Sequence, residues 1–213
     1  MARDYKKGSF LKAEHCQHVV QIGQIGYASL TDALIAAKDG EVLVLLDDVE
    51  LGTQLRLERS ITLTIDGAAP RTVRYTGSGA ALELTDGCVV TGGSMDAPLI
   101  IDGGEIHRSD ALIRLEGKDI LLRYVRVQNS CNAEYGGGIY AAAGTNARME
   151  RCAIAHNCAL AGGGGFVEDG AELYLHRCLI TDNWAESVGG AFRVKGKLLP
   201  TGCCIENNRA ASA

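Results

Sequence analysis

Three short stretches near the C-terminus repeat one pattern of residues, and this repetition decides the fold. The stretches are Arg151–Asn157 (RCAIAHN), Arg177–Asn183 (RCLITDN) and Cys203–Asn208 (CCIENN). A looser copy, 125–130 (VRVQNS), precedes them. The spacings are 27, 26 and 25 residues along the series Val125, Cys152, Cys178 and Cys203.

A glycine-rich phrase repeats in step with this pattern. It reads GGGI at Gly136–Ile139, GGGF at Gly163–Phe166 and GGAF at Gly189–Phe192, with spacings that place Ile139, Phe166 and Phe192 in one register. Two phrases that recur together indicate a repeat architecture.

Each repeat is too short and too rich in glycine for a pair of helices. Apolar and polar residues alternate within it, as in Met149–Ile154 (MERCAI), and alternation is typical of strands. Strands joined by Gly and Asn turns predict one coil of a β-solenoid, with neighbouring coils ~4.8 Å apart. Equivalent residues should then stack in ladders. These ladders are Cys152, Cys178 and Cys203 inside the coil, Val127, Ile154, Ile180 and Ile205 beside them, and Ser130, Asn157, Asn183 and Asn208 at a bend.

The repeated residues resemble the right-handed parallel β-helix repeats of bacterial surface adhesins. Polymorphic outer-membrane and autotransporter passenger domains carry similar repeats, as do pectate-lyase-like proteins. Residues 27–42 also resemble the segment that precedes such a β-helix in large surface proteins of Gram-positive gut bacteria. The resemblance implies an all-β, single-stranded parallel β-helix. It also implies an adhesin-like, extracellular cell-surface location, with the export signal and anchor outside this segment.

A chain of 213 residues favours one elongated domain. We expect a segment with a capping helix at 1–40 and a β-helix at 41–213, whose last four coils, about 112–208, are regular. Ser29 and Asp32 predict the start of the helix, and Gly40 its C-cap. The series breaks off where another glycine phrase would follow, which predicts a truncated, uncapped last coil. That coil could self-associate end to end.

Composition narrows the classes of partner. The net charge is −5 and no basic block is present, which argues against nucleic acid. No window offers the ~18 apolar residues of a membrane span, and residues 1–7 lack the apolar stretch of a signal peptide. Aromatic residues make up only 5%, as suits a narrow interior.

The eight cysteines could be reduced and buried, or could form a disulfide or a metal site. The laddered cysteines favour a buried, reduced stack, and no spacing matches a zinc site. Cys131 and Cys158, 27 residues apart, form the pair to suspect first if a disulfide exists. A metal site at His15–His18 (HCQH) lacks a fixed scaffold.

Polysaccharide cleavage, by a lyase or a glycoside hydrolase, is one alternative for function. In register, outward His156 falls beside Asp182, with Asn129 and Asn207 flanking them. These are weak catalytic candidates, because cleavage requires paired carboxylates or calcium with a base. We therefore assign no catalytic residue and expect no enzyme. An acidic set permits calcium but matches no known loop pattern; we expect no cofactor. The set is Asp102, Glu105, His107 and Asp110.

Binding of a glycan or a surface protein through the lateral face is the preferred function. Trp184 is the only tryptophan and the natural anchor, although its ring could equally pack on a neighbouring turn. The candidate ligand-binding residues are Trp184, Tyr135, Glu186, Arg151 and Arg177. A passive structural stalk is the other alternative.

Overall fold

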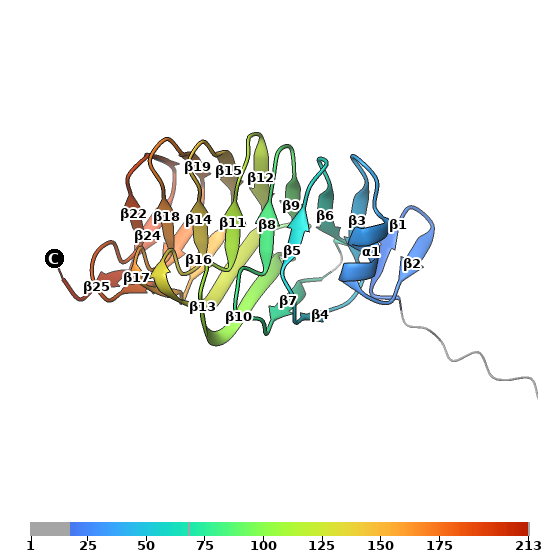
Figure 1. Ribbon diagram of the computed structural model, residues 1–213, viewed down its shortest axis with the longest axis horizontal. Helices are drawn as coiled ribbons and strands as arrows, with labels where there is room; N and C mark the ends of the chain where they lie inside the picture. Colours follow the sequence, from blue (N-terminus) through green and yellow to red (C-terminus); the bar gives the residue numbers. More distant parts are fainter. Residues whose placement is uncertain (1–17, 68, 213) are drawn as a thin grey trace, which may run out of the picture.

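The computed structural model describes residues 18–67 and 69–212, without the side chain of residue 133. These residues form a stack of coils along one long axis, with a single short helix at one end (Figure 1). Each full coil contributes a strand to each of three sheets, called here A, B and C, and every pairing between coils is parallel. The expected all-β solenoid is confirmed.

Sheet A runs the length of the molecule. Its strands, in spatial order, are β2 (Ile25–Tyr27), β1 (Val20–Ile22), β3 (Val42–Leu45), β6 (Thr62–Ile65), β9 (Val89–Thr91), β12 (Ile120–Arg123), β15 (Asn146–Glu150), β19 (Glu172–His176) and β23 (Lys197–Thr201).

Sheets B and C form the other two sides of each coil. Sheet B contains β4 (Val49–Leu51), β7 (Arg71–Tyr75), β10 (Leu99–Arg108), β13 (Val125–Tyr135), β16 (Ala153–Ala155), β20 (Leu179–Thr181) and β24 (Cys204–Glu206), with β17 (Cys158–Ala161), β21 (Trp184–Ala185) and β25 (Arg209–Ala210) off the main path. Sheet C contains β5 (Leu55–Leu57), β8 (Leu82–Leu84), β11 (Ile113–Leu115), β14 (Ile139–Ala141), β18 (Gly165–Val167) and β22 (Phe192–Val194).

The core fills the narrow interior between the sheets. In most strands alternate side chains point inward and are buried, mostly Leu, Ile, Val and Ala, as strand geometry requires. The predicted apolar ladder is confirmed, because Val127 pairs with Ile154, Ile154 with Ile180 and Ile180 with Ile205. Ile205 is nonetheless 50% exposed, since it lies in the last coil described.

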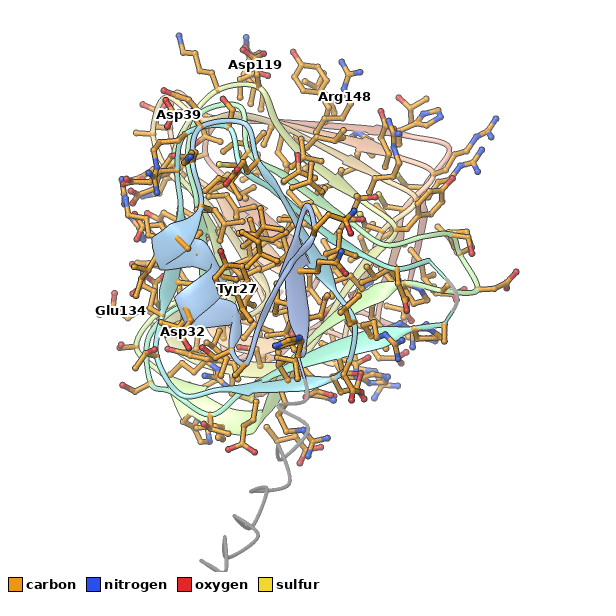
Figure 2. The ribbon with its side chains drawn as sticks, turned by 90° about the vertical axis from the view of Figure 1, so that its right-hand side faces the viewer. Tyr27, Asp32, Asp39, Asp119, Glu134 and Arg148 are labelled. Carbon is orange, nitrogen blue, oxygen red and sulfur yellow. A yellow bond between two sulfur atoms is a disulfide. The ribbon has the colours of Figure 1, made fainter. Side chains whose placement is uncertain are left out.

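The N-terminal end of the stack is covered. β1 runs antiparallel to both β2 and β3, and α1 (Leu30–Ala36) packs beside them with Leu30 and Ala33 buried (Figures 1 and 2). The Ser29 hydroxyl accepts the Asp32 N–H, which confirms the predicted N-cap. The predicted C-cap was wrong. Ala37 closes the last turn by donating to Ala33 and Leu34, and Gly40 lies in the following turn.

The predicted stack of amide side chains is confirmed at the bend after sheet B. The backbone N–H of Asn157 donates to Oδ1 of Asn183 (3.0 Å), and that of Asn183 donates to Oδ1 of Asn208 (3.1 Å). Ser130 donates in the same way to Asn157. Each amide nitrogen returns a hydrogen bond to a carbonyl of the preceding coil, as Asn183 does to Ile154 (2.9 Å). We call this series the amide ladder.

The register predicted for the glycine phrase was wrong by one residue in one coil. Ile139 pairs with Gly165, and Gly165 with Phe192, whereas Phe166 pairs with Tyr140. Four glycines stand in a row at 162–165, so the phrase itself does not fix the alignment. Phe192 occupies the interior space beside Gly165, where a Cβ would meet its ring.

Most of residues 104–110 are strand. β10 continues to Arg108, and after an irregularity between Asp102 and Ile106 it pairs again with β13, Ile106 opposite Ser130. Two lengthened strands thus thicken the middle of the molecule. Arg108 ends this extension and is almost fully buried.

The cysteines divide as the sequence suggested. Cys152, Cys178 and Cys203 are free and stacked, with the Cys178 N–H donating to Sγ of Cys203 (3.4 Å). A hydrogen bond from Cys152 lowers the pKa of the Cys178 thiol to about 7, while burial raises that of Cys152. Cys131 and Cys158 form a disulfide between neighbouring coils. The candidate His15–His18 cluster lies outside the described residues except for His18.

Candidate functional site

The outer face of sheet A changes character along the molecule. One row of paired outward positions begins with Val42, Thr62 and Val89 and continues through Leu121, Arg148, Tyr174 and Leu199. A second row runs from Thr91 through Arg123, Glu150, His176 and Thr201. β-Branched and aromatic residues both suit strand positions, so the change along sheet A is the appearance of charged residues and histidine in the later coils.

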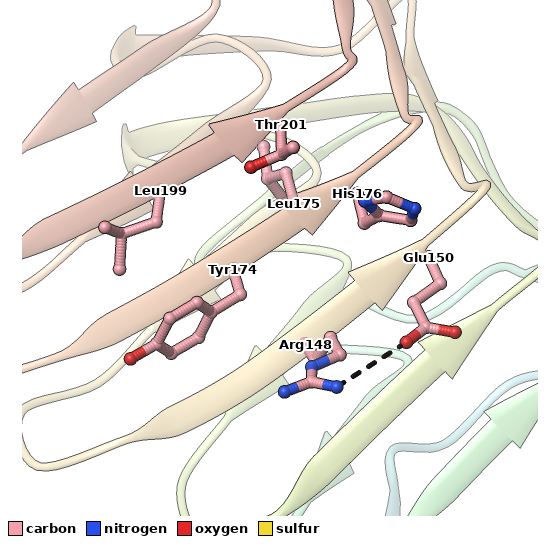
Figure 3. A pocket seen from close by; sticks show the side chains of 7 residues that line it. All are labelled: Arg148, Glu150, Tyr174, Leu175, His176, Leu199 and Thr201. Atoms are coloured by element: carbon pink, nitrogen blue, oxygen red, sulfur yellow. Dashed lines mark ion pairs between the residues drawn. The ribbon is translucent and has the colours of Figure 1, made fainter.

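A shallow hollow of about 510 Å³ lies on this later part of sheet A. Figure 3 shows the side chains that line it on β15, β19 and β23. Tyr174 lies on the middle strand, paired with Arg148 on one side and Leu199 on the other. Arg148 projects outward at the surface of the molecule (Figure 2). The hollow therefore combines an aromatic ring with a guanidinium and a carboxylate.

The charges on sheet A are partly paired. Glu150 binds Arg123 (2.8 Å) and lies 3.8 Å from Arg148. At the far edge, Lys197 binds Glu172 (2.6 Å), and this hydrogen bond lowers the pKa of the Glu172 carboxyl and raises that of Lys197. Such exposed pairs contribute little to stability, so their main effect is to set the local charge.

The corner between sheets A and B carries two of the predicted ligand-binding residues. Arg151 and Arg177 occupy equivalent positions with left-handed backbone, φ 51° and 53°, as does Tyr124 one coil earlier, φ 53°. Nη1 of Arg151 donates to the Tyr124 hydroxyl (3.2 Å) and its guanidinium lies 5.8 Å from that ring. The two arginines are neighbours in the stack, as the sequence predicted.

Trp184 lies at the opposite end of the short strands of sheet B. It pairs with Cys158 on one side and Arg209 on the other, and its side chain is 42% exposed. A second hollow of about 510 Å³ surrounds it. Asp182, Asn183, Trp184, Asn207 and Arg209 line this Trp184 hollow.

The structure does not bring the other two predicted residues into this hollow. The ring of Tyr135 packs against Phe166 at 4.9 Å, with the Arg193 guanidinium 5.7 Å away. Glu186 is exposed, and its N–H donates to Ala159. Tyr135 thus completes the packing over Phe166, two coils before Trp184.

His156 and Asp182, the weak catalytic candidates, share a corner row with Asn129 and Asn207. All four have left-handed backbone. The Asp182 carboxylate accepts the Thr181 hydroxyl at 2.7 Å. In the described part of the chain no hydrogen bond or ion pair joins His156 to Asp182, so the row brings them near without forming an acid–base pair.

The acidic set in the long strand β10 is dispersed. Asp102 is buried and accepts Gln128 (2.9 Å) and Asn129 (3.1 Å). Asp110 instead pairs with Arg114. Across residues 18–67 and 69–212, no three His, Cys, Asp or Glu side chains converge as ligands of a metal ion would. Within the same residues, no helix has the length and apolar character to cross a membrane.

The sequence reasoning missed the face of sheet A. Arg148, Glu150, Tyr174 and His176 stand at alternate positions of two aligned repeats, and this alternation was the available signal. The repeated asparagine and glycine positions lie at the bends of the coil and the repeated cysteines point inward, whereas the outward positions of sheet A do not repeat. A search restricted to repeated residues therefore passes over them.

Comparison with known proteins agrees with the fold. A family model described as a right handed beta helix region matches residues 111–212. No curated protein and no solved structure gives a significant match. The coil stack is accordingly a right-handed parallel β-helix, and the match covers the regular coils in which both hollows lie.

Proposed function

We propose that this chain is an adhesin-like domain at a bacterial cell surface that binds a glycan through its lateral face without cleaving it. The Trp184 hollow carries the proposal. Trp184, which is partly exposed, lines this hollow together with a carboxylate, amide groups and a guanidinium. Aromatic faces stack on the apolar faces of sugars, and planar polar groups bind pairs of hydroxyls.

The backbone around Trp184 is well fixed, which favours binding. Its N–H donates to Asn157 (2.9 Å), and the neighbouring Asn183 is a buried member of the amide ladder. A preformed site loses little conformational entropy when a ligand binds. A ring presented on such a frame can bind a flexible glycan without first becoming ordered itself.

The disulfide supports an extracellular location. Cys131–Cys158 joins two coils covalently, and disulfides persist mainly in oxidising compartments. A protein partner on the same face, a passive stalk and a polysaccharide-cleaving enzyme are the competing functions. End-to-end self-association through the last coil stays a prediction.

The test uses the only tryptophan as its own reporter. Purified protein is screened on an array of neutral bacterial, plant and host glycans. Hits are titrated by intrinsic fluorescence in the wild type, where the signal reports on Trp184 directly, and by isothermal titration calorimetry in the wild type and in every variant. We expect Trp184→Ala to weaken binding roughly tenfold or more, and Trp184→Phe to retain part of it. Tyr174→Ala, the matched aromatic truncation in the sheet A hollow, should leave binding unchanged.

The outcomes separate the competing functions. Silence across the array, with a folded protein by circular dichroism, rejects glycan binding and favours a stalk or a protein partner. New reducing ends or unsaturated products from a bound glycan reveal cleavage and contradict the non-enzymatic proposal.

A further inference from the structure

Five arginines gather around the corner between sheets A and B in a chain whose net charge is −5. We call them the arginine strip. Its members are Arg123 on β12, Arg126 on β13, Arg148 on β15, and Arg151 and Arg177 in the bends that follow β15 and β19. The strip follows the helix axis over three consecutive coils.

Most of this positive charge is not neutralised by the protein. Within residues 18–67 and 69–212, Glu150 is the one carboxylate that forms ion pairs with the strip, and it is shared by Arg123 and Arg148. Among the residues that the structure describes, no acidic side chain forms an ion pair with Arg126, Arg151 or Arg177. Like charges held close together are unfavourable without a counterion, so the strip is suited to an anionic ligand.

The backbone shows that the fold does not require arginine at these positions. Left-handed conformation costs a residue other than glycine about 1–2 kcal/mol, and Asn, Asp and His are the usual exceptions. The other corner row obeys this rule with Asn129, His156, Asp182 and Asn207. At the corner between sheets A and B, the left-handed residues are instead Tyr124, Arg151 and Arg177, followed by Gly202 at φ 63°. Gly202 shows that this bend accepts glycine, so the arginines are not required by the fold.

The side chains of the row are arranged to present charge outward. Tyr124 orients Arg151 through its hydroxyl and its ring. A hollow of about 350 Å³ opens there, lined by Arg123, Tyr124, Glu150, Arg151 and His176. The backbones of equivalent arginines in consecutive coils lie ~4.8 Å apart, which is the spacing of neighbouring strands. Arginine binds carboxylate and sulfate oxygens in a bidentate manner.

We propose that the arginine strip binds a linear anionic polysaccharide, bearing carboxylate or sulfate groups, laid along the helix axis. A row of charges that recurs once per coil matches a polymer whose charges also recur regularly. The surface is separate from the Trp184 hollow, which lies at the other end of β20. A nucleic acid fits less well, because the chain as a whole is acidic, with a net charge of −5.

The experiment removes the charge without straining the fold. In Arg151→Gly/Arg177→Gly both side chains are lost, and the left-handed backbone becomes easier to adopt. Arg59→Gly is the matched control, since Arg59 is also left-handed, φ 58°, and exposed but lies in an early coil. Binding to immobilised dextran sulfate, a polyuronate, neutral dextran and duplex DNA is measured at low and at physiological salt.

We expect dextran sulfate or the polyuronate, or both, to bind more tightly than neutral dextran, and the better of the two to identify the anionic group. The affinity of the double variant should be lower by roughly tenfold or more. Wild-type binding should be weaker at physiological salt than at low salt. Arg59→Gly should behave as wild type. The proposal would be overturned by undiminished binding in the double variant or by equal binding of neutral dextran. It would also be overturned if neither polyanionic glycan bound or if DNA were preferred.

The variant Trp184→Ala distinguishes polyanion binding at the arginine strip from neutral glycan binding at the Trp184 hollow. It should leave polyanion binding unchanged, whereas the double arginine variant should leave neutral glycan binding unchanged. A parallel loss in both variants would mean a single shared site and would also overturn the proposal.

Discussion

The early and late coils stabilise the bend after sheet B in different ways. In the late coils the amide ladder binds the bend after sheet B, one asparagine per coil. In the early coils the equivalent bend, after β7, is bound by one buried side chain from the next coil. Arg108 donates to the carbonyls of Tyr75, Gly77 and Gly103, and its guanidinium lies 4.7 Å from the Tyr75 ring.

This difference shows two ways of closing a solenoid coil. The ladder uses short identical residues whose amides bind each other and the backbone, so every coil repeats the same chemistry. Arg108 spans three carbonyls with one long cation, a solution that works at one place only. Repeated solutions leave a periodic signal in the sequence, and single ones do not.

The largest loss of stability is expected when Arg108, which binds the bend of the early coils, is replaced. Arg108→Met should lower the free energy of unfolding by about 4 kcal/mol, because three buried carbonyls lose their donor. Denaturant unfolding measures this loss, and hydrogen exchange locates it in the early coils. Arg126→Met, at an exposed position of sheet B, should change stability by less than about 0.5 kcal/mol. Equal losses in the two variants would show that Arg108 does not hold the bend.

The second-largest effect is expected at the disulfide Cys131–Cys158, which lies between the early and the late coils. Cys131–Cys158 closes a loop with a sequence separation of 27 residues, for which chain entropy predicts about 3.5 kcal/mol. Cys131→Ser/Cys158→Ser should therefore lower the melting temperature by several degrees, and reducing agent should do the same to the wild type but not to the variant. Cys204→Ser, at an exposed free cysteine, serves as control. A wild type insensitive to reductant would mean that the coils hold this junction without the bond.

The smallest effect tests whether the ladder is strongest at its centre. Asn183→Ala should lower stability by about 2 kcal/mol, because Asn183 accepts from Asn157 and donates to Ile154 and Asn208. Asn208→Ala removes fewer buried contacts and should cost about 1 kcal/mol or less. The same denaturation assay compares the two variants. Equal losses would contradict a ladder whose central members matter most.

The repeated features were predictable from the sequence. The amide ladder, the cysteine stack and the apolar ladder each depend on residues that recur at coil spacing, and the N-cap of α1 depends on a local motif. The register at Phe166 was not predictable, because glycine has no side chain to mark which face it occupies. Arg108 was missed for a related reason, since a charged residue in a polar stretch indicates solvent unless its partners are known.

The candidate site was predictable only in part. Trp184 was found because it is unique, and Arg151 and Arg177 because they precede repeated cysteines. The contact of the Tyr135 ring with Phe166 was not predictable, because it depends on the register at Phe166; a role of Tyr135 in binding stays a prediction. Tyr174 and His176 were missed because their significance appears only when paired strands place Arg148 and Glu150 beside them.

The amide ladder has a direction, and this bears on how the protein is made. Each bend N–H in the ladder is bound by the asparagine of the following coil, never by that of the preceding one. The covered N-terminal end supplies a surface on which the first coil can form. As the polypeptide leaves a ribosome or a secretion pore, each newly emerged coil can complete the bend before it. Assembly can therefore proceed vectorially, with the emerging chain itself acting as the template for its next turn.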